Sequence, residues 1–496
     1  MFKAEFVGRS RELETLDALW NSNRATLLVL SGRRRVGKTR LLTHWLQMHP
    51  DDGLYWVAEP GSELTQLRSF SQAFEAFVDP EMPVPSDFTY ATWEQAFRQV
   101  SRYAKSRRIA IFIDEFTYLI DVNPDIVGTL QKSWDHTLSN SNLMLSLSGS
   151  QMGLMQRHLL DIQAPLYGRA TSQMQLPALP FGATSEYFPE YGVIDRVGLF
   201  AMWGGVPAYW ERLNPELSVV ENLRRNILPS HAWMMDESRI LLQDFIKDLH
   251  NYVGILRAIA DGEQAMGEIA KRTGLATSKA SFYLNTLQKT GFVERQVPIT
   301  QRNTNSRRGR YVVTDPYLRF FYRFLAAYQS KLALGQIDQM FDLIQNELPE
   351  FIRTNTWREL CQEWVLRASA DNQFPVDIEA VGSEWSKNLE IDVVGINEIT
   401  KTLILGDCHW TSEPVGVEAV KALVQKTSLI VPKKEQEEWT IYYTCFSASG
   451  WTDEAKKQAD SIAAKGGGRK KPKWNSAGIR LVSLDDVDED LVRLSL

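Results

Sequence analysis

The stretch LSGRRRVGKTRLL, residues 30–42, limits the fold of this chain more than any other part of the sequence. A continuous apolar run over residues 25–32 precedes it, and such a run predicts a strand that is covered on both faces. The residues that follow, 38–48, predict a helix with one apolar side. Between them lies the spacing Gly32-x-x-x-x-Gly37-Lys38-Thr39. This order of strand, glycine-rich loop and helix predicts an α/β domain with a parallel sheet.

The residue types of this loop fit a polyphosphate ligand. Gly32 and Gly37 permit a tight turn and a close approach of the backbone, so that successive N–H groups and the helix N-terminus face an anion. Lys38 would neutralise the phosphates, and the Thr39 hydroxyl would bind Mg²⁺. Arg40 follows directly and is a further candidate contact to the nucleotide.

A phosphate loop also needs a metal-binding acid, and residues 107–119, RRIAIFIDEFTYL, supply one. Residues 109–113 predict a buried strand, and two acids follow at its carboxyl end, where ligands bind in open α/β sheets. Asp114 is predicted to hold the magnesium shell and Glu115 to act as the general base on the attacking water. At the end of a further apolar strand within 143–154, Ser148 or Ser150 either senses the terminal phosphate or belongs to a serine-rich turn.

Length and composition set the wider limits. With 496 residues the chain should form three or four domains, and its net charge of −6 confines any nucleic-acid contact to local patches. Three cysteines fit neither a disulfide framework nor a paired metal motif, which favours a reducing compartment. The first residues, MFKAEFVGRS, do not resemble a signal peptide, and no apolar run approaches the length of a membrane helix. We therefore expect a cytoplasmic protein.

Helical patterns dominate from residue 181 to about 250 and predict a helical lid after the sheet domain. Residues 255–300 then predict three short helices, the second over 266–272 and the third over 277–289, with Thr277 as N-cap and Gly291 just past the helix end. Two short strands around the tip TQRNTNSRRGR complete the pattern of a winged helix-turn-helix.

Charge supports contact between this winged helix and DNA. Residues 247–310 carry eleven lysines and arginines against five acids in an otherwise acidic chain. We predict that the third helix enters a major groove and that the wing touches phosphates. The candidate contacts are Ser278, Lys279, Ser281 and Lys289 on the helix and Arg307, Arg308 and Arg310 in the wing. Winged helices also bind other proteins, so a protein partner stays open as the alternative.

Several segments together resemble the archaeal-type ATPases, relatives of the AAA+ and STAND NTPases. They are FVGRSREL at 6–13, GRRRVGKT, IFIDE, PLYGRA at 165–170 and WGGVPAYW at 203–210. The resemblance implies that Gly8 and Arg9, followed by Glu12, lie by the adenine. It implies that Gly205 and Pro207 of the lid pack near the nucleotide, and that Arg169 lies near the phosphates. The bound species would be ATP with Mg²⁺, and the absence of an Asn-Lys-x-Asp signature for guanine agrees with ATP.

The winged helix of that family runs into aromatic helices, here YVVTDPYLRFFYRFL at 311–325, and then into a C-terminal domain. That domain resembles the PD-(D/E)xK nucleases, in which two acids hold a metal that activates water against a phosphodiester. The resemblance implies a site built from Glu359, Asp392, Asp407 and His409, with Glu363 one helical turn after Glu359.

One position departs from the nuclease pattern, because His409 stands where the family carries a lysine. Histidine is mostly neutral at pH 7 unless a nearby carboxylate raises its pKa, and Asp407 is close enough in sequence to do so. His409 is alternatively a metal ligand, and Lys421 on the following helix is a candidate replacement for the lysine. A decayed site on a retained fold is the competing interpretation. The basic segment Lys465 to Lys473 is expected to be a solvated loop, with nucleic-acid contact as the alternative.

We therefore predict five units: an ATPase core over 1–180, a helical lid over 181–245, a winged helix-turn-helix over 246–320, a helical linker over 321–350 and a nuclease-like domain over 351–496. Three functions follow. The first is an Mg²⁺-dependent ATPase whose nucleotide state controls a DNA-contacting winged helix and the nuclease-like C-terminal domain. The others are a slow ATP-dependent switch or scaffold for protein partners, and an ATP-regulated nuclease. Arg33, Arg34 and Arg35 are expected to point to solvent or to a partner subunit in a homo-oligomer, with no role assigned.

Overall fold

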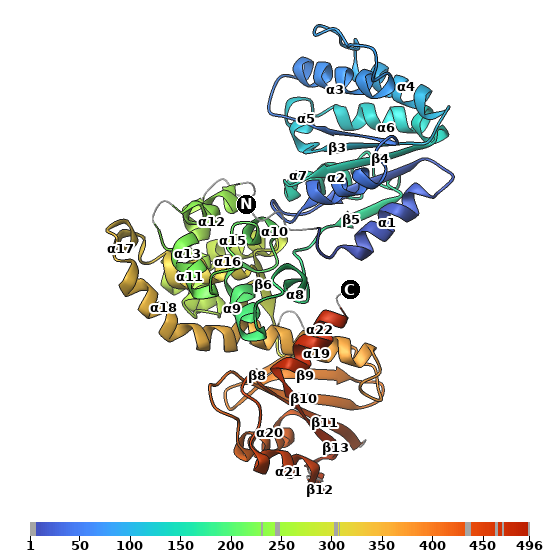
Figure 1. Cartoon of the computed structure of the whole chain (residues 1–496). Coiled ribbons are helices and arrows are strands. Elements are labelled where there is room, and N and C mark those ends of the chain that lie inside the picture. The colour runs from blue at the N-terminus through green and yellow to red at the C-terminus, as the bar shows by residue number, and fades with distance from the viewer. Residues whose placement is uncertain are drawn as a thin grey trace.

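The computed structural model describes residues 6–229, 232–243, 249–301, 306, 308–431, 438–461, 465–468 and 471–494. The chain forms an α/β unit at its N-terminal end, a helical middle and a second sheet at its C-terminal end (Figure 1). Within the described ranges, no helix is both long enough and apolar enough to cross a membrane.

The first sheet is fully parallel, with strand order β2-β3-β4-β1-β5. Its strands are β1 (Thr26–Ser31), β2 (Gly53–Val57), β3 (Ile109–Asp114), β4 (Leu143–Gly149) and β5 (Ser172–Gln175). Every residue of β1, β3 and β4 is buried, as the continuous apolar runs predicted. The two flanking strands, β2 and β5, were not predicted.

Helices cover both faces of this sheet. On one face, α1 (Ser10–Trp20) and α2 (Lys38–Met48) pack Leu16, Leu41 and Trp45 against alternate residues of the strands. The other face is covered by α3 (Glu63–Val78), α4 (Trp93–Ala104), α5 (Thr117–Val122) and α6 (Ile126–His136). A short helix, α7 (Met152–Met155), follows β4. The carboxyl ends of β1 and β3 therefore meet at one edge, as the motif required.

The helical middle begins with α8 (Ala183–Tyr187), α9 (Val193–Trp203), α10 (Pro207–Trp210), α11 (Val219–Asn226) and α12 (Trp233–Gln243). The helix-turn-helix follows as α13 (Leu249–Ala260), α14 (Met266–Thr273) and α15 (Thr277–Lys289), with the hairpin β6 (Val293–Gln296) and β7 (Arg310–Val313). These elements match the predicted pattern, but Thr277 is not the N-cap. Ala276 holds that position without a side-chain cap, whereas Gly291 has the expected positive φ of 76°.

Three helices lead to the last domain: α16 (Pro316–Phe320), α17 (Gln329–Ala333) and α18 (Ile337–Ile352). That domain is a six-stranded mixed sheet in the order β12-β13-β11-β10-β9-β8. Its strands are β8 (Ala380–Ser386), β9 (Leu389–Asn397), β10 (Thr402–His409), β11 (Glu438–Ser447), β12 (Lys465–Gly468) and β13 (Lys471–Ser483). Its helices are α19 (Arg358–Ala370), α20 (Val417–Ile430), α21 (Asp453–Ser461) and α22 (Leu484–Arg493). The loop predicted over 465–473 was wrong for 465–468 and 471–473, which are strand, while 469–470 lie outside the described residues.

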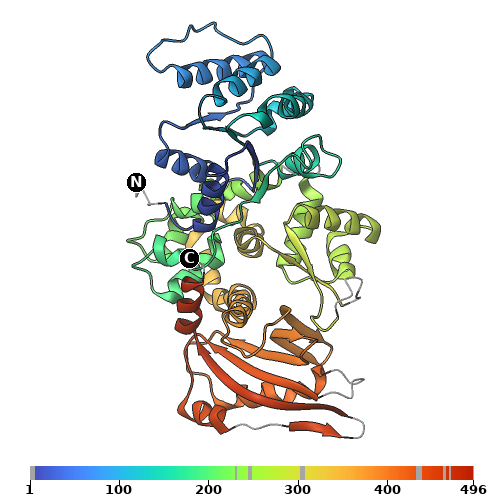
Figure 2. The ribbon, with the colours of Figure 1, turned by 90° about the vertical axis from the view of Figure 1, so that its right-hand side faces the viewer.

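The middle and the C-terminal domain share one apolar core, which runs from Leu179 to Leu491. The wing also packs directly on edge strand β8, where the Ile299 amide donates to the Ser383 carbonyl at 3.0 Å and the Thr300 hydroxyl donates to Glu384 at 2.8 Å. Figure 2 shows the winged-helix hairpin reaching towards the C-terminal sheet. The wing is thus bound to its own C-terminal domain.

Candidate functional site

The phosphate loop closes between β1 and α2. Gly37 precedes the helix with φ 99°, a conformation that a side chain would strain. A Cβ on Gly32 would lie 2.8 Å from the Leu176 carbonyl oxygen, so only glycine fits there. Lys38 Nζ donates to the carbonyls of Gly32 and Arg33 at 2.8 and 3.0 Å, which holds the ammonium over the loop.

Asp114 lies at the end of β3, buried and surrounded by donors. Its carboxylate accepts hydrogen bonds from the hydroxyls of Thr39 at 2.6 Å, Tyr55 at 2.6 Å and Ser148 at 2.5 Å, and from the Glu115 amide at 2.9 Å. Burial acts to raise the pKa of Asp114, but these donors outweigh it and lower the pKa below the ordinary value. The group therefore stays ionised at neutral pH, as a magnesium ligand must.

Glu115 follows with φ 50°, in the left-handed region that non-glycine residues rarely adopt. The Ser150 hydroxyl lies 2.9 Å from both of its carboxylate oxygens. Ser148 thus donates a hydrogen bond to Asp114, and Ser150 donates one to Glu115. Each serine has a defined partner, which a serine-rich turn would not require. The strained backbone and the serine together fix the direction of the Glu115 side chain.

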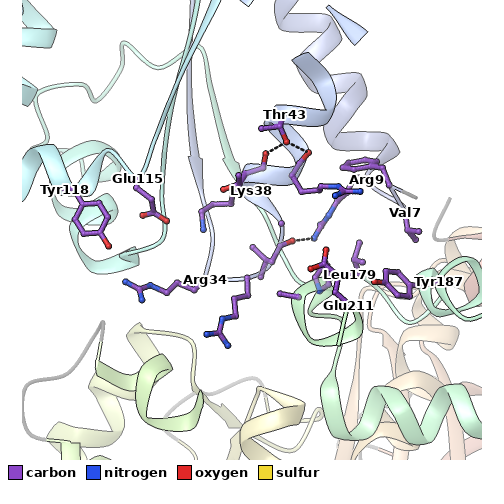
Figure 3. Close-up of a pocket in the computed structure, with 18 residues that line it drawn as sticks. Val7, Arg9, Arg34, Lys38, Thr43, Glu115, Tyr118, Leu179, Tyr187 and Glu211 are labelled. Carbon is purple, nitrogen blue, oxygen red and sulfur yellow. Dashed lines mark hydrogen bonds between the residues drawn. The ribbon is translucent and has the colours of Figure 1, made fainter. Parts of the chain in front are cut away.

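A cavity of about 540 Å³ opens over these residues. Lys38, Thr39, Arg40 and Glu115 line it. In Figure 3, Glu115 and Tyr118 lie on one side of this space, whereas Val7, Arg9, Leu179 and Tyr187 gather on the other. One wall is therefore charged and the opposite wall is largely apolar or aromatic, which suits a nucleotide with its phosphates at the loop.

Of the residues implied by the family resemblance, Arg9 and Pro207 line this cavity. Arg9 is buried and bonds Glu12 at 2.9 Å, the Val36 carbonyl at 3.0 Å and the Pro177 carbonyl at 2.7 Å. Gly8 does not line the cavity itself but lies in the sequence between the lining residues Val7 and Arg9. Gly205 supports the wall, since its carbonyl accepts a hydrogen bond from the Leu179 amide at 2.6 Å.

Arg169 is not brought to the cavity. Its guanidinium makes two hydrogen bonds to the Asp135 carboxylate, at 2.7 and 2.9 Å, and it does not belong to the cavity lining. The structure therefore gives this arginine a contact within the sheet domain in place of the expected position near the phosphates.

The expectation for the loop arginines was wrong for Arg33 and Arg35. Arg33 pairs with Asp315 and donates to the Tyr209 hydroxyl at 2.9 Å, and Arg35 pairs with the buried Glu237. Both guanidinium groups thus pair with acids of their own chain that lie beyond the ATPase domain. Arg34 and Arg35 both line the cavity.

Sequence reasoning also missed Tyr55, which lies on the unpredicted strand β2 and donates to Asp114. Burial, followed by the bond to Asp114, raises the pKa of Tyr55, so the phenol stays a donor. The signal was the run LYWV at 54–57, which is rich in residues that favour strands and comes directly after Gly53. Tyr118 and Tyr187, which also line the cavity, carried no comparable signal.

The second predicted site is only partly assembled. Asp392 and Asp407 line a cavity of about 570 Å³ with His409 and Arg358. Glu359 does not line it and instead pairs with Arg319 at 2.7 Å. Among the residues that the structure describes, no cluster of three or more histidines, cysteines and acids is placed to hold a metal.

His409 is not the cation of this site. Burial lowers the pKa of His409 despite the nearby Asp407, which argues against the partial protonation considered from the sequence. Lys421 pairs with Glu418 on its own helix, and it is Lys426 that reaches Asp407, at 2.6 Å. Burial raises the pKa of Asp407, and the Lys426 ammonium opposes that shift.

The predicted DNA contacts fall into two groups. Ser278, Lys279 and Lys289 are exposed on α15, where Ser281 is half-buried. The wing differs, because Arg310 pairs with Glu390 at 3.2 Å and the Arg308 carbonyl accepts from Trp385 Nε1 at 2.9 Å. Arg307 lies outside the described residues. The C-terminal domain thus contacts the described part of the wing.

Replacing Ser148 by alanine should cost about 1.5 to 3 kcal/mol of unfolding free energy at pH 7, because it removes a hydrogen bond to a buried charge. Since the pKa of Asp114 is lowered in the folded state, its contribution is present at neutral pH and is lost as the pH falls through that lowered value. The difference between wild type and variant should therefore shrink below about pH 4. Urea unfolding across this range measures it.

Ser146 provides the matched control on the same strand, since its buried hydroxyl has no hydrogen-bond partner in the part of the chain that the structure describes. Ser146→Ala should not lower the unfolding free energy at either pH, because it removes that buried hydroxyl without breaking a hydrogen bond of the described structure. Equal losses in the two variants would show that Ser148 does not act through Asp114.

Comparison with known proteins agrees with this geometry. Residues 6–195 match an ATPase domain found predominantly in Archaea, 249–297 match the IclR helix-turn-helix domain, and 321–422 match archaeal and bacterial proteins of unknown function. An uncharacterised protein of Methanocaldococcus jannaschii is 27% identical over 405 residues, which is 82% of this chain and 87% of that protein. A short uncharacterised ATP-binding protein of the same organism is 55% identical over 42 residues, 8% of this chain and 71% of that protein.

Solved structures give weaker similarity. The Walker-type ATPase of Pyrococcus abyssi has a TM-score of 0.49 at 19% identity, covering 64% of this chain and 96% of its own. The Aeropyrum pernix ORC2 protein has a TM-score of 0.40 at 12% identity, covering 69% and 97%. The family matches are the firmer result: residues 6–195 match an ATPase domain found predominantly in Archaea, and matches to a helix-turn-helix domain and to proteins of unknown function follow along the chain.

Proposed function

We propose that the chain binds ATP with Mg²⁺ at the phosphate loop and hydrolyses it. The observation that carries this proposal is that Lys38, Thr39 and Glu115 line one cavity while Thr39 is bonded to the ionised Asp114. A hydroxyl and a carboxylate that already touch are the oxygen ligands that Mg²⁺ prefers, so the residues present fit the metal. When bound, Mg²⁺ would withdraw charge from the phosphate oxygens.

The protein residues have separate tasks in this proposal. Lys38 and the loop amides neutralise and hold the phosphates. Glu115, directed by Ser150, takes a proton from the attacking water. The adenine ring packs against the wall formed by Val7, Leu179 and Tyr187.

The chain divides, in this proposal, into five units: 1–180, 181–245, 246–320, 321–350 and 351–496. The nucleotide bound to the first unit controls the position of the others. The winged helix contacts DNA through the exposed face of α15, because the described wing arginines are engaged by the C-terminal domain. That engagement also favours a second candidate, an ATP-dependent switch that acts on protein partners and leaves the wing covered.

Salt-dependent binding of duplex DNA to the full chain distinguishes these two functions. Lys279→Ala should weaken binding and reduce the slope of log affinity against log salt by about one, because one phosphate contact is lost. Lys105→Ala, an exposed lysine of the ATPase domain, should leave the slope unchanged. Absent or salt-independent retention would favour the protein switch.

A third candidate, metal-dependent nuclease activity, rests on Lys426. It places an ammonium 2.6 Å from Asp407, in a cavity that Asp392 also lines, and so supplies the cation that His409 does not. Nicking of supercoiled plasmid in Mg²⁺ or Mn²⁺, lost in Asp392→Asn, would support it. Nicking that persists in this variant would exclude the cavity lined by Asp392 and Asp407 as its source.

A further inference from the structure

The side chains of two arginines in the phosphate loop extend from the ATPase domain and form ion pairs with acids of the helical middle. Arg33 pairs with Asp315 and also donates to the Tyr209 hydroxyl at 2.9 Å. Arg35 pairs with Glu237, and its guanidinium lies 4.7 Å from the centre of the Trp233 ring. We call these two ion pairs the arginine clamp.

The acids of the clamp are buried and are built into the helices that carry them. Glu237, on α12, has no exposed surface, and its second oxygen accepts from the Tyr209 hydroxyl at 2.6 Å. Asp315 is the N-cap of α16, accepting from the Leu318 amide at 2.8 Å. Buried carboxylates need a cation, and here both cations come from the phosphate loop. A change in the loop therefore changes the environment of both helix positions.

The loop end of the clamp lies where phosphates would bind. The Arg33 carbonyl accepts from Lys38 Nζ, and Arg35 lines the nucleotide cavity with φ 71°, a conformation that non-glycine residues rarely hold. If Lys38 turns towards a triphosphate, it gives up the carbonyls of Gly32 and Arg33. The backbone of residues 32–35, which carries the two arginine side chains, would then change its conformation.

The two acids of the clamp lie on either side of the helix-turn-helix in the sequence. Glu237 lies on the helix before α13, and Asp315 comes two residues after β7. The DNA-binding candidate region, residues 249–313, is thus attached to the phosphate loop at both its entry and its exit. Contacts 202 and 282 residues apart in the sequence converge on the six-residue loop 32–37.

We propose that the arginine clamp transmits the nucleotide state from the phosphate loop to the helix-turn-helix. The inference rests on the proposed function, because it requires ATP at the loop. Binding of ATP repositions Arg33 and Arg35, and the two ion pairs carry this change to α12 and α16. The clamp is a regulatory contact and does not take part in the hydrolysis itself.

Hydrogen exchange of the full chain, with and without Mg²⁺ and ATP, tests the clamp. Asp315→Asn keeps an equally good N-cap, and Glu237→Gln keeps an acceptor for Tyr209, so both remove charge with little change in shape. In the wild type, ATP should slow exchange in the phosphate loop and change exchange in residues 249–313 about fivefold or more. Both variants should keep the loop protection and lose the response in 249–313.

Asp338→Asn is the control, since it breaks an exposed ion pair with Arg224 between α11 and α18 and should respond like the wild type. Absence of loop protection in the wild type would mean that the proposed function fails. Loop protection with no response in 249–313, or with an equal response in the variants, would overturn the clamp alone.

Discussion

Replacing Glu115 by glutamine is expected to leave ATP affinity within about twofold and to slow hydrolysis roughly 10² to 10⁴-fold, the usual contribution of a positioned general base. Glutamine keeps the size of the side chain and an acceptor for the Ser150 hydroxyl. The backbone at φ 50° should therefore keep its conformation. It cannot take a proton from water. Single-turnover phosphate release and nucleotide binding, measured on the same preparation, separate the two effects.

Glu81→Gln is a suitable control, because this glutamate is exposed in the same domain and outside the cavity lining. It should hydrolyse ATP like the wild type. Turnover of Glu115→Gln close to that of the wild type would remove Glu115 from the role of base, even if ATP binding is confirmed.

Replacing Lys38 by alanine should have the largest effect on binding. The buried ammonium is held over the loop by two carbonyls and is the charge nearest to the expected phosphates. Losing one partner of a buried charged contact costs about 2 to 5 kcal/mol, which corresponds to a roughly 30-fold to several-thousand-fold loss of affinity. Titration of the full chain with a fluorescent ATP analogue measures it.

Lys132→Ala, an exposed lysine on α6, controls for the loss of charge alone and should bind like the wild type. Circular dichroism of Lys38→Ala should match the wild type, because the removed bonds lie within one loop. Affinity retained within about threefold would place the nucleotide somewhere other than this loop.

The parts of the site that the sequence predicted are those set by local rules. Gly32, Gly37 and Lys38 have a fixed spacing, and Asp114 follows a strand that is apolar throughout. Tyr55 could not be placed in the same way. Its strand has five residues of mixed burial, and its role depends on the pairing of β2 with β3, which brings Val57 beside Asp114.

The partners of the loop arginines could not be predicted because they depend on tertiary packing. Nothing near Arg33 in the sequence points to an acid 282 residues later. A surface position was the reasonable expectation for three adjacent arginines. The same limit applies to Lys426, which lies on the helix after β10 and reaches Asp407 only because α20 folds back over the sheet.

The C-terminal domain shows how a motif can agree in order and differ in geometry. Asp392 and Asp407 share a cavity, as their strands predicted, but Glu359 on α19 pairs with Arg319 on α16 and does not line it. The wing was predicted to touch DNA phosphates, whereas Arg308 and Arg310, its described arginines, contact Trp385 and Glu390 of the neighbouring domain. Surface charge in the sequence does not reveal which domain covers it.

A crystal structure of the full chain with Mg²⁺ and a non-hydrolysable ATP analogue tests the central claim most directly. The account predicts the triphosphate at the loop between Gly32 and Thr39, with Lys38 turned onto it and the metal bound by Thr39 and Asp114. A nucleotide found outside the cavity lined by Lys38 and Glu115, or bound there with its phosphates away from the loop, would contradict it.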